Sequence, residues 1–162
     1  MGGDFDHRWT QAWEAVRALK VLWTKDEAAF HSRYDDFPPV SCSPKAAHKP
    51  HPPVLLGGHA PHVLPRVARY ADGWLPTRTT PGQVAASRKR LDTLAAERGR
   101  DPVAVTIAVC GQPPDTTRDQ VDAFLNTGAV HVAVWPTHGA TAQAMGEQCE
   151  RMADALVRSL SP

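Results

Sequence analysis

From residue 54 onward, short apolar runs alternate with segments whose apolar residues recur every three or four positions. Short apolar runs are typical of buried parallel strands, and the three-to-four spacing is typical of amphipathic helices. The pattern predicts strands over residues 54–56, 73–77, 103–109 and 129–135, and helices over residues 62–71, 81–99, 117–126 and 141–160. Four βα units in succession predict an α/β fold with a parallel sheet, either open or forming half of an eight-unit barrel.

Turn chemistry sharpens the predicted helix ends. Thr80 followed by Pro81 is typical of an N-cap and first helical position, and either Thr116 or Thr117 is suited to cap the following helix. Glycines close helices because they adopt the left-handed conformation without a steric cost. We therefore expect these two helices to end near Gly99 and Gly128.

The first third of the chain has a different pattern. Residues 8–23 place Trp9, Trp13, Val16 and Trp23 near helical spacing, which predicts a leading helix with a broad apolar face for packing. Residues 24–53 contain prolines that exclude a regular helix, so we expect an irregular Pro-rich insertion, either a functional loop or a linker.

Composition narrows the class of protein. With 162 residues, the chain is long enough for a single domain over 1–162. The formal net charge of +1 gives no basic excess for nucleic acid or an anionic membrane, and no apolar stretch is long enough to span a bilayer. An odd number of widely spaced cysteines and an N-terminus without a signal peptide favour a cytoplasmic protein with reduced thiols.

The strongest candidate for binding chemistry is the run Pro53–Gly58, where an apolar strand ends in two glycines before a predicted helix. Glycines let the backbone approach a ligand closely, and the following helix N-terminus attracts anions. The turn is therefore a candidate phosphate cradle. The alternative is that Gly57 and Gly58 only close a strand, and the local sequence favours that alternative.

Other chemistry is weaker. The pairs His48-x-x-His51 and His59-x-x-His62 lack the converging ligands of a metal centre, so we expect no metal site. The pair Trp135-Pro136 ends the last predicted strand, where it walls a cofactor cleft or packs internally.

Several motifs in order resemble the bacterial luciferase-like monooxygenase family. They are the helix end Ala18–Thr24, the Phe30-His31-Ser32 loop, the Pro44–Pro53 stretch, Pro53–Gly58, and Arg69-Tyr-Ala-Asp-Gly-Trp74. Within the family, the branch most similar is that of probable deazaflavin-dependent oxidoreductases. The sequence departs from the family pattern at Ser32, which replaces the usual glycine, and at His59, which stands where many relatives carry asparagine.

The resemblance implies a TIM barrel of the (βα)8 type, of which the chain matches only the C-terminal half: a helix, an insertion and strands five to eight. The first four strands and their catalytic residues have no counterpart, so the catalytic residues are unknown. The family binds the cofactor phosphate after its fifth strand, which matches Leu56, Gly57, Gly58 and His59 here, with Thr77 as a further hydroxyl donor. Thr77 otherwise only opens a turn, and Arg78 either adds charge or is solvated.

The implied function is a flavin- or deazaflavin-dependent oxidoreductase that transfers hydride between the cofactor ring and a small organic substrate. Coenzyme F420 is the favoured cofactor, and FMN is the alternative. The implied partner is a missing N-terminal half-barrel or a second copy of the chain. The competing hypothesis is a non-catalytic half-barrel that serves as a fragment or scaffold.

Overall fold

The computed structural model describes residues 5–102, 105–137 and 141–156. Its contacts group the chain into two compact units, Met1–Val54 and Leu55–Pro162. The boundary coincides with the start of the predicted βα rhythm at residue 54. The single domain expected over residues 1–162 stays a prediction.

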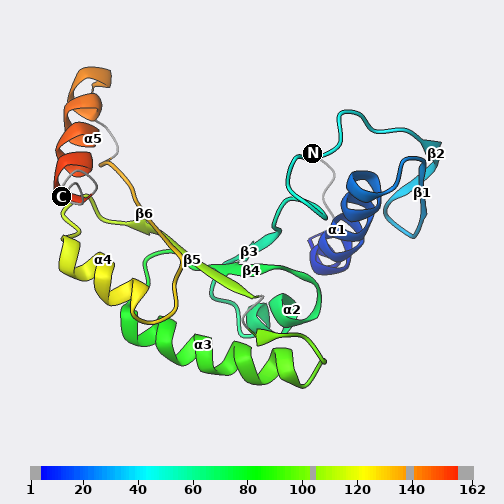
Figure 1. Ribbon diagram of the computed structural model, residues 1–162, viewed down its shortest axis with the longest axis horizontal. Helices are drawn as coiled ribbons and strands as arrows, with labels where there is room; N and C mark the ends of the chain where they lie inside the picture. The colour runs from blue at the N-terminus through cyan, green and yellow to red at the C-terminus, as the bar shows by residue number, and fades with distance from the viewer. Residues whose placement is uncertain (1–4, 103–104, 138–140, 157–162) are drawn as a thin grey trace. The chain divides into compact units, whose positions relative to one another are not determined.

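The second unit is built on a parallel sheet whose strands follow the chain order. The four strands lie in the order β3-β4-β5-β6, and each pairs in parallel with its neighbour (Figure 1). They are β3 (Leu55–Gly57), β4 (Gly73–Leu75), β5 (Thr106–Gln112) and β6 (His131–Val134). The predicted parallel α/β arrangement of four βα units is confirmed.

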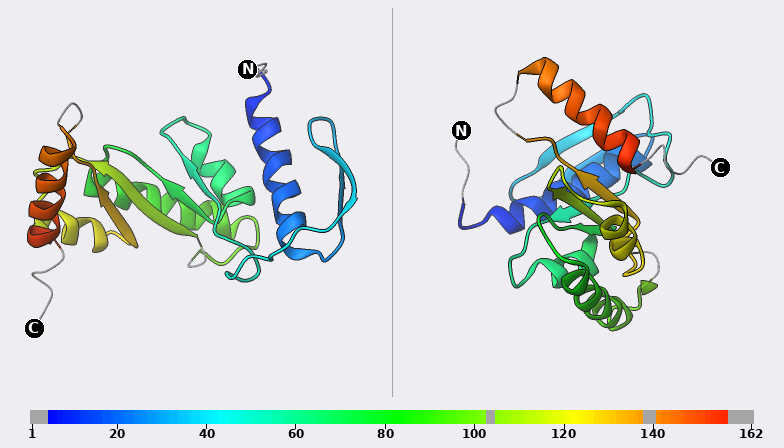
Figure 2. Two further views of the ribbon diagram at one scale, coloured as in Figure 1. Left: turned by 90° about the horizontal axis from the view of Figure 1, so that it is seen from above. Right: turned by 90° about the vertical axis from the view of Figure 1, so that its left-hand side faces the viewer.

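Each strand is followed by a helix: α2 (Val63–Tyr70), α3 (Pro81–Ala96), α4 (Arg118–Leu125) and α5 (Ala142–Leu156). Figure 1 and Figure 2 show α2 and α3 along the same side of the sheet, and the two helices contact each other. The core lies between this side and the helices. Its completely buried members include Val67, Val84, Leu91 and Ile107.

Three strand boundaries differ from prediction for local reasons. The strand expected over 73–77 ends at Leu75, because Pro76 has no N–H to donate, although Thr77 still forms an isolated bridge with Cys110. The strand expected over 103–109 spans Thr106–Gln112 instead, since a register shift and the positive φ of Gly111 (69°) let it continue. The first strand is displaced by one residue, to Leu55–Gly57.

Residues 103–104 and 157–162 lie outside the described part of the chain, so the predicted starts and ends that fall there stay predictions. Within the described part, the helix expected to reach Gly99 ends at Ala96, and Gly99 takes the predicted left-handed conformation with φ 66°. The last predicted strand is shorter than expected, at His131–Val134.

Both predicted N-caps are capping boxes. The Thr80 hydroxyl accepts from the N–H of Gln83, whose side chain accepts from the N–H of Thr80, and Pro81 occupies the first turn. At α4 the cap is Thr117 rather than Thr116, with Gln120 as its reciprocal partner. These boxes fix where each helix begins after its strand.

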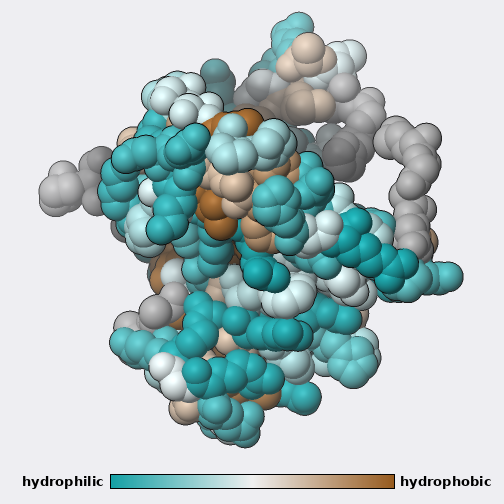
Figure 3. Space-filling model, turned by 90° about the vertical axis from the view of Figure 1, so that its right-hand side faces the viewer, coloured by the Kyte–Doolittle hydropathy of each residue, from teal (hydrophilic) through white to brown (hydrophobic). Residues whose placement is uncertain are grey.

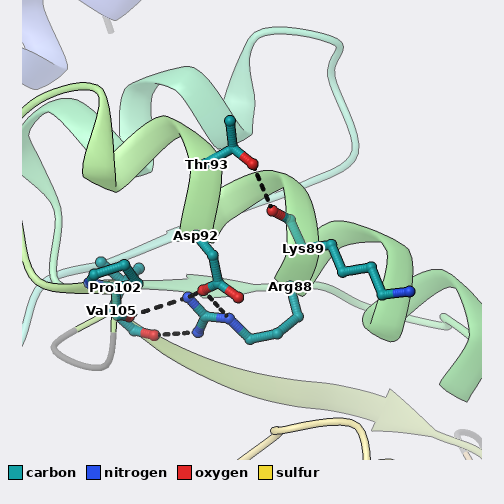
Figure 4. Close-up of polar contacts among 6 residues, drawn as sticks. All are labelled: Arg88, Lys89, Asp92, Thr93, Pro102 and Val105. Carbon is teal, nitrogen blue, oxygen red and sulfur yellow. Dashed lines mark hydrogen bonds and ion pairs between the residues drawn. The ribbon is translucent and has the colours of Figure 1, made fainter.

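Arg88 ties α3 to the segment before β5 (Figure 4). Its guanidinium donates to Asp92 one turn later and to the carbonyl groups of Pro102 and Val105. These contacts lie at the amino ends of the strands, the side of such a sheet where residues serve stability rather than chemistry.

The first unit contains α1 (Arg8–Thr24) and an antiparallel pair, β1 (Ala28–His31) and β2 (Asp36–Val40). The prediction that residues 24–53 are irregular is therefore wrong for this hairpin. Its prolines, Pro38 and Pro39, are tolerated because they lie where the register shifts between the pairs Phe30–Phe37 and Ala28–Val40, and prolines are accommodated at such irregularities of edge strands.

The inner side of the hairpin packs through alternating residues of β1. Ala28 and Phe30 are buried, and Phe30 stacks on Phe37 of β2 with ring centroids 6.1 Å apart. Exposed large apolar side chains of this unit include Phe5, Leu19 and Val40. On the face of the molecule drawn in Figure 3, hydrophobic patches lie among mainly hydrophilic residues.

Glu14 fastens α1 to the loop between β1 and β2. Its carboxylate accepts from the Ser32 hydroxyl at 2.6 Å and from the Tyr34 N–H at 2.9 Å. These hydrogen bonds, the Ser32 bond above all, hold the pKa of Glu14 below its usual value. Ser32, the departure from the family's glycine, therefore has a defined partner.

A carboxyl with a lowered folded-state pKa stabilises the fold above its unfolded-state pKa, about 4.3 for Glu, and loses that contribution as pH falls through the folded value. We expect the thermal midpoint of the wild-type chain to fall more steeply between pH 5 and about pH 3 than that of Glu14→Gln. The exposed Glu27→Gln variant is the control and should follow the wild type. Equal acid sensitivity of Glu14→Gln and wild type contradicts the role of this contact.

Candidate functional site

The turn after β3 lies at the carboxyl edge of the sheet. Gly57 pairs with Leu75, so β3 and β4 end side by side. Gly58 has φ 100°, a conformation that side-chain-bearing residues rarely adopt, and a Cβ built there would meet nothing within 4 Å. The glycine is required by the backbone, and the space beside it is open.

Two hydrogen bonds, which we call the clasp, hold this turn to β4 and the loop after it. The indole N–H of Trp74 donates to the Gly58 carbonyl at 2.9 Å, and Nε2 of His59 lies 2.7 Å from the Thr77 carbonyl. Because a carbonyl only accepts, His59 donates through a protonated Nε2. The His59 ring also meets Trp74 edge-on, with centroids 6.2 Å apart.

The clasp uses carbonyl groups and leaves the backbone amide of His59 available. This N–H donates to no backbone carbonyl of the described residues, and His59 is exposed. A free N–H beside a glycine turn suits the acceptor oxygens of an anion, and a phosphate fits such a donor.

The structure treats the predicted site residues differently. It brings Gly58, His59 and Thr77 together through the clasp. Leu56 is half-buried and packs against the core, so only its backbone is available to a ligand. His59 uses Nε2 for the Thr77 carbonyl, which makes it a positioning group for the turn.

Nucleophilic chemistry has no support at the nearby thiol. Burial raises the pKa of Cys110, so the thiol stays protonated at neutral pH. Among the described residues, no three His, Cys, Asp or Glu side chains converge as a metal-binding group would.

The sequence did not predict a cavity of about 540 Å³ at the carboxyl ends of β4, β5 and β6. Arg78, Gln112 and Trp135 are among the residues that line it. The one sequence signal for this cavity is the Trp135-Pro136 pair, which is interpreted from the sequence either as the wall of a cleft or as internal packing. Trp135 is 46% exposed, which favours the wall.

No helix in the described ranges combines the length and apolar character needed to cross a bilayer.

Comparison with known proteins identifies a family model and several relatives. A family model described as luciferase-like monooxygenase matches residues 1–158. The chain is 28% identical to an FMNH(2)-dependent dimethylsulfone monooxygenase of Pseudomonas putida, over 65% of this chain and 28% of the relative. It is 35% identical to an uncharacterised protein of Mycobacterium tuberculosis, over 67% of this chain and 38% of the relative. The chain thus spans about a third of the length of these curated relatives.

Solved structures with a similar fold have low sequence identity. The monooxygenase RslO1 from Streptomyces bottropensis superposes with a TM-score of 0.70 at 16% identity, over 98% of this chain and 63% of that one. An F420-dependent secondary alcohol dehydrogenase in complex with an F420-acetone adduct gives 0.71 at 14% identity, over 96% and 64%. These neighbours are luciferase-like TIM-barrel enzymes, so the fold class is that of a partial TIM barrel.

The clasp predicts a specific effect of Trp74→Phe. The variant keeps an aromatic ring in the core but leaves the Gly58 carbonyl without its indole donor, so we expect a loss of about 1 kcal/mol in the free energy of unfolding. The backbone of Gly58 and His59 should also become more mobile. Urea unfolding measures the first effect, and 15N relaxation of the two amides measures the second.

Trp23→Phe is the matched control, since the Trp23 ring packs on His51 in the first unit. It should leave the 15N relaxation of Gly58 and His59 unchanged. Unchanged relaxation of these two amides in Trp74→Phe itself would show that the turn does not depend on the clasp.

Proposed function

Because the chain belongs to the luciferase-like monooxygenase family, we propose that it supplies the cofactor-phosphate end of a flavin- or deazaflavin-dependent oxidoreductase. The observation that carries the proposal is the Gly58 turn: a φ of 100°, open space where a side chain would stand, and a His59 N–H that donates to no backbone carbonyl of the described residues. The turn also stands at the carboxyl edge of the strands, where enzymes of this fold keep their active sites.

In this proposal the N–H groups of Gly58 and His59 donate to the phosphate, and the Thr77 hydroxyl adds a further donor. Gly57 is exposed and has no side chain, so a ligand can approach its backbone. The Leu56 backbone continues the cradle on the strand side. When bound, the cofactor ring supplies the hydride chemistry, and the protein positions it against a small organic substrate.

Coenzyme F420 is the cofactor we favour, and FMN is the alternative. Solved neighbours include the F420-dependent alcohol dehydrogenase and a coenzyme F420-dependent tetrahydromethanopterin reductase from Methanopyrus kandleri, with a TM-score of 0.66. The dimethylsulfone monooxygenase of Pseudomonas putida uses FMNH(2), which supports the alternative. In this proposal both cofactors present a phosphate to the same turn.

The described sheet has four strands, and the chain covers 63% and 64% of the two solved neighbours described above. In our proposal the four strands are the second half of a barrel, so a complete active site needs further strands. In our proposal a separate N-terminal half-barrel or a second copy of the chain provides them, together with the catalytic residues. A cytoplasmic location is part of the same proposal and rests on the free cysteines Cys42, Cys110 and Cys149.

The proposal predicts that FMN binds at least tenfold more tightly than riboflavin, which lacks the phosphate, a difference of about 1.4 kcal/mol. Gly58→Ala should remove most of this preference, because any side chain disfavours the φ that aims the amides. Fluorescence titration of FMN and riboflavin measures the ratio of their affinities. Coenzyme F420 should behave as FMN does in the wild type and in Gly58→Ala.

Gly99→Ala is the matched control. Gly99 also has positive φ and open space around its Cβ position, but it follows α3 and lies away from the turn. It should lower stability to a similar degree and keep the preference for FMN. Equal binding of FMN and riboflavin by the wild type would remove the phosphate role. No binding of either cofactor would favour the competing hypothesis of a non-catalytic half-barrel, which the partial match to the curated relatives also supports.

A further inference from the structure

The cavity beyond the glycine turn is formed by three consecutive strand ends. Arg78 and Thr79 follow β4, Gly111 and Gln112 end β5, and Trp135 follows β6. In the described structure its lining carries a single formal charge, that of Arg78. A volume of about 540 Å³ lies within the range of small-molecule sites.

One wall of the cavity is the ring of Trp135, which lies against Gly111. A Cβ built on Gly111 would lie 3.4 Å from the Trp135 ring, so the absence of a side chain lets the indole lie against the bulge of β5. The backbone N–H of Trp135 donates to the Gln112 carbonyl at 2.9 Å, which fixes the backbone of Trp135. Trp135 nevertheless stays 46% exposed. It therefore presents a fixed and accessible ring.

The opposite side carries the charge. Arg78 is the one non-glycine residue with positive φ (46°) in the described structure, and its N–H donates to the Cys110 carbonyl at 3.2 Å. No Asp or Glu of the described residues forms an ion pair with it. A strained, exposed and unpaired arginine at a cavity is a candidate for ligand binding.

Two side-chain amides hold the segments that form the cavity. Gln148 of α5 contacts Thr137 twice: its Oε1 accepts from the Thr137 N–H at 2.9 Å, and its Nε2 donates to the Thr137 hydroxyl at 3.2 Å. On the other side, the buried Gln112 donates to the Thr79 carbonyl at 3.4 Å. Both amides are positioning groups that fix the segments bearing Trp135 and Arg78.

We propose that this cavity binds a flat organic anion, which stacks on Trp135 and pairs with Arg78, at a place separate from the phosphate turn. An indole face favours flat, conjugated molecules, and a lone guanidinium favours a carboxylate, which it grips with two parallel hydrogen bonds. In the oxidoreductase proposed above, on which this assignment rests, the cavity is the substrate pocket.

The probe is 2-naphthoate, with 2-naphthamide as its uncharged counterpart, titrated into the full chain by calorimetry. We expect the anion to bind about fivefold more tightly than the amide, the weight of one solvent-accessible ion pair. Arg78→Asn should abolish that preference, since Asn tolerates positive φ but carries no charge. Arg78→Lys should keep part of it.

Trp135→Leu should weaken both probes by about fivefold, because it keeps an apolar side chain but removes the stacking face. The controls are Arg90→Asn, which removes an arginine that lines a different cavity, and Trp23→Leu in the first unit. Both should bind the probes as the wild type does. Binding that is unchanged in Arg78→Asn and Trp135→Leu would overturn the proposal, as would the absence of any naphthoate binding.

Competition separates this inference from the proposed function. Saturating inorganic phosphate should leave naphthoate binding unchanged, and Gly58→Ala should bind naphthoate normally while losing its preference for FMN. Displacement of naphthoate by phosphate would place both anions at the turn and overturn a separate site. If naphthoate binds but the FMN preference is absent, the cavity stands and its assignment as a substrate pocket falls.

Discussion

The parallel register of the sheet is the constraint on which the site depends. Gly57 pairs with Leu75, Thr77 bridges to Cys110, and Gln112 pairs with Val134. In a parallel sheet these pairings bring successive carboxyl ends to one edge, although the residues are far apart in the chain. The candidate phosphate turn and the cavity therefore lie at neighbouring strand ends of one edge of the sheet.

The loop Thr77–Thr79 connects the two places. Its Thr77 carbonyl accepts from His59 of the turn, Arg78 lines the cavity, and the Thr79 carbonyl accepts from Gln112. Its backbone is fixed by hydrogen bonds at both ends, which is the condition under which a residue such as Arg78 keeps an unfavourable φ. A molecule bound on either side thus meets a preorganised loop.

The fold was largely predictable because local patterns agree with it. The capping residues Thr80 and Thr117, the apolar strands and the closing glycines each carry a short-range signal. The β1–β2 hairpin was missed because Pro38 and Pro39 argue against regular structure, and the edge strand accommodates them where its register shifts.

The candidate site was predictable in part. The pair Gly57-Gly58 at the end of an apolar run is a local signal that can be read directly from the sequence. The indole of Trp74 at the Gly58 carbonyl and the packing of Trp135 on Gly111 each join residues from different βα units. Their pairing depends on strand register and a bulge, which no single segment of the sequence encodes.

The most direct test of the phosphate turn is an amide NMR titration of the chain with FMN, with 15N labels and riboflavin as the reference. The account predicts that the phosphate-dependent shifts are largest at the amides of Gly58 and His59 and small around Trp135. Phosphate-dependent shifts that leave Gly58 and His59 unmoved, or that centre on Arg78, would contradict it.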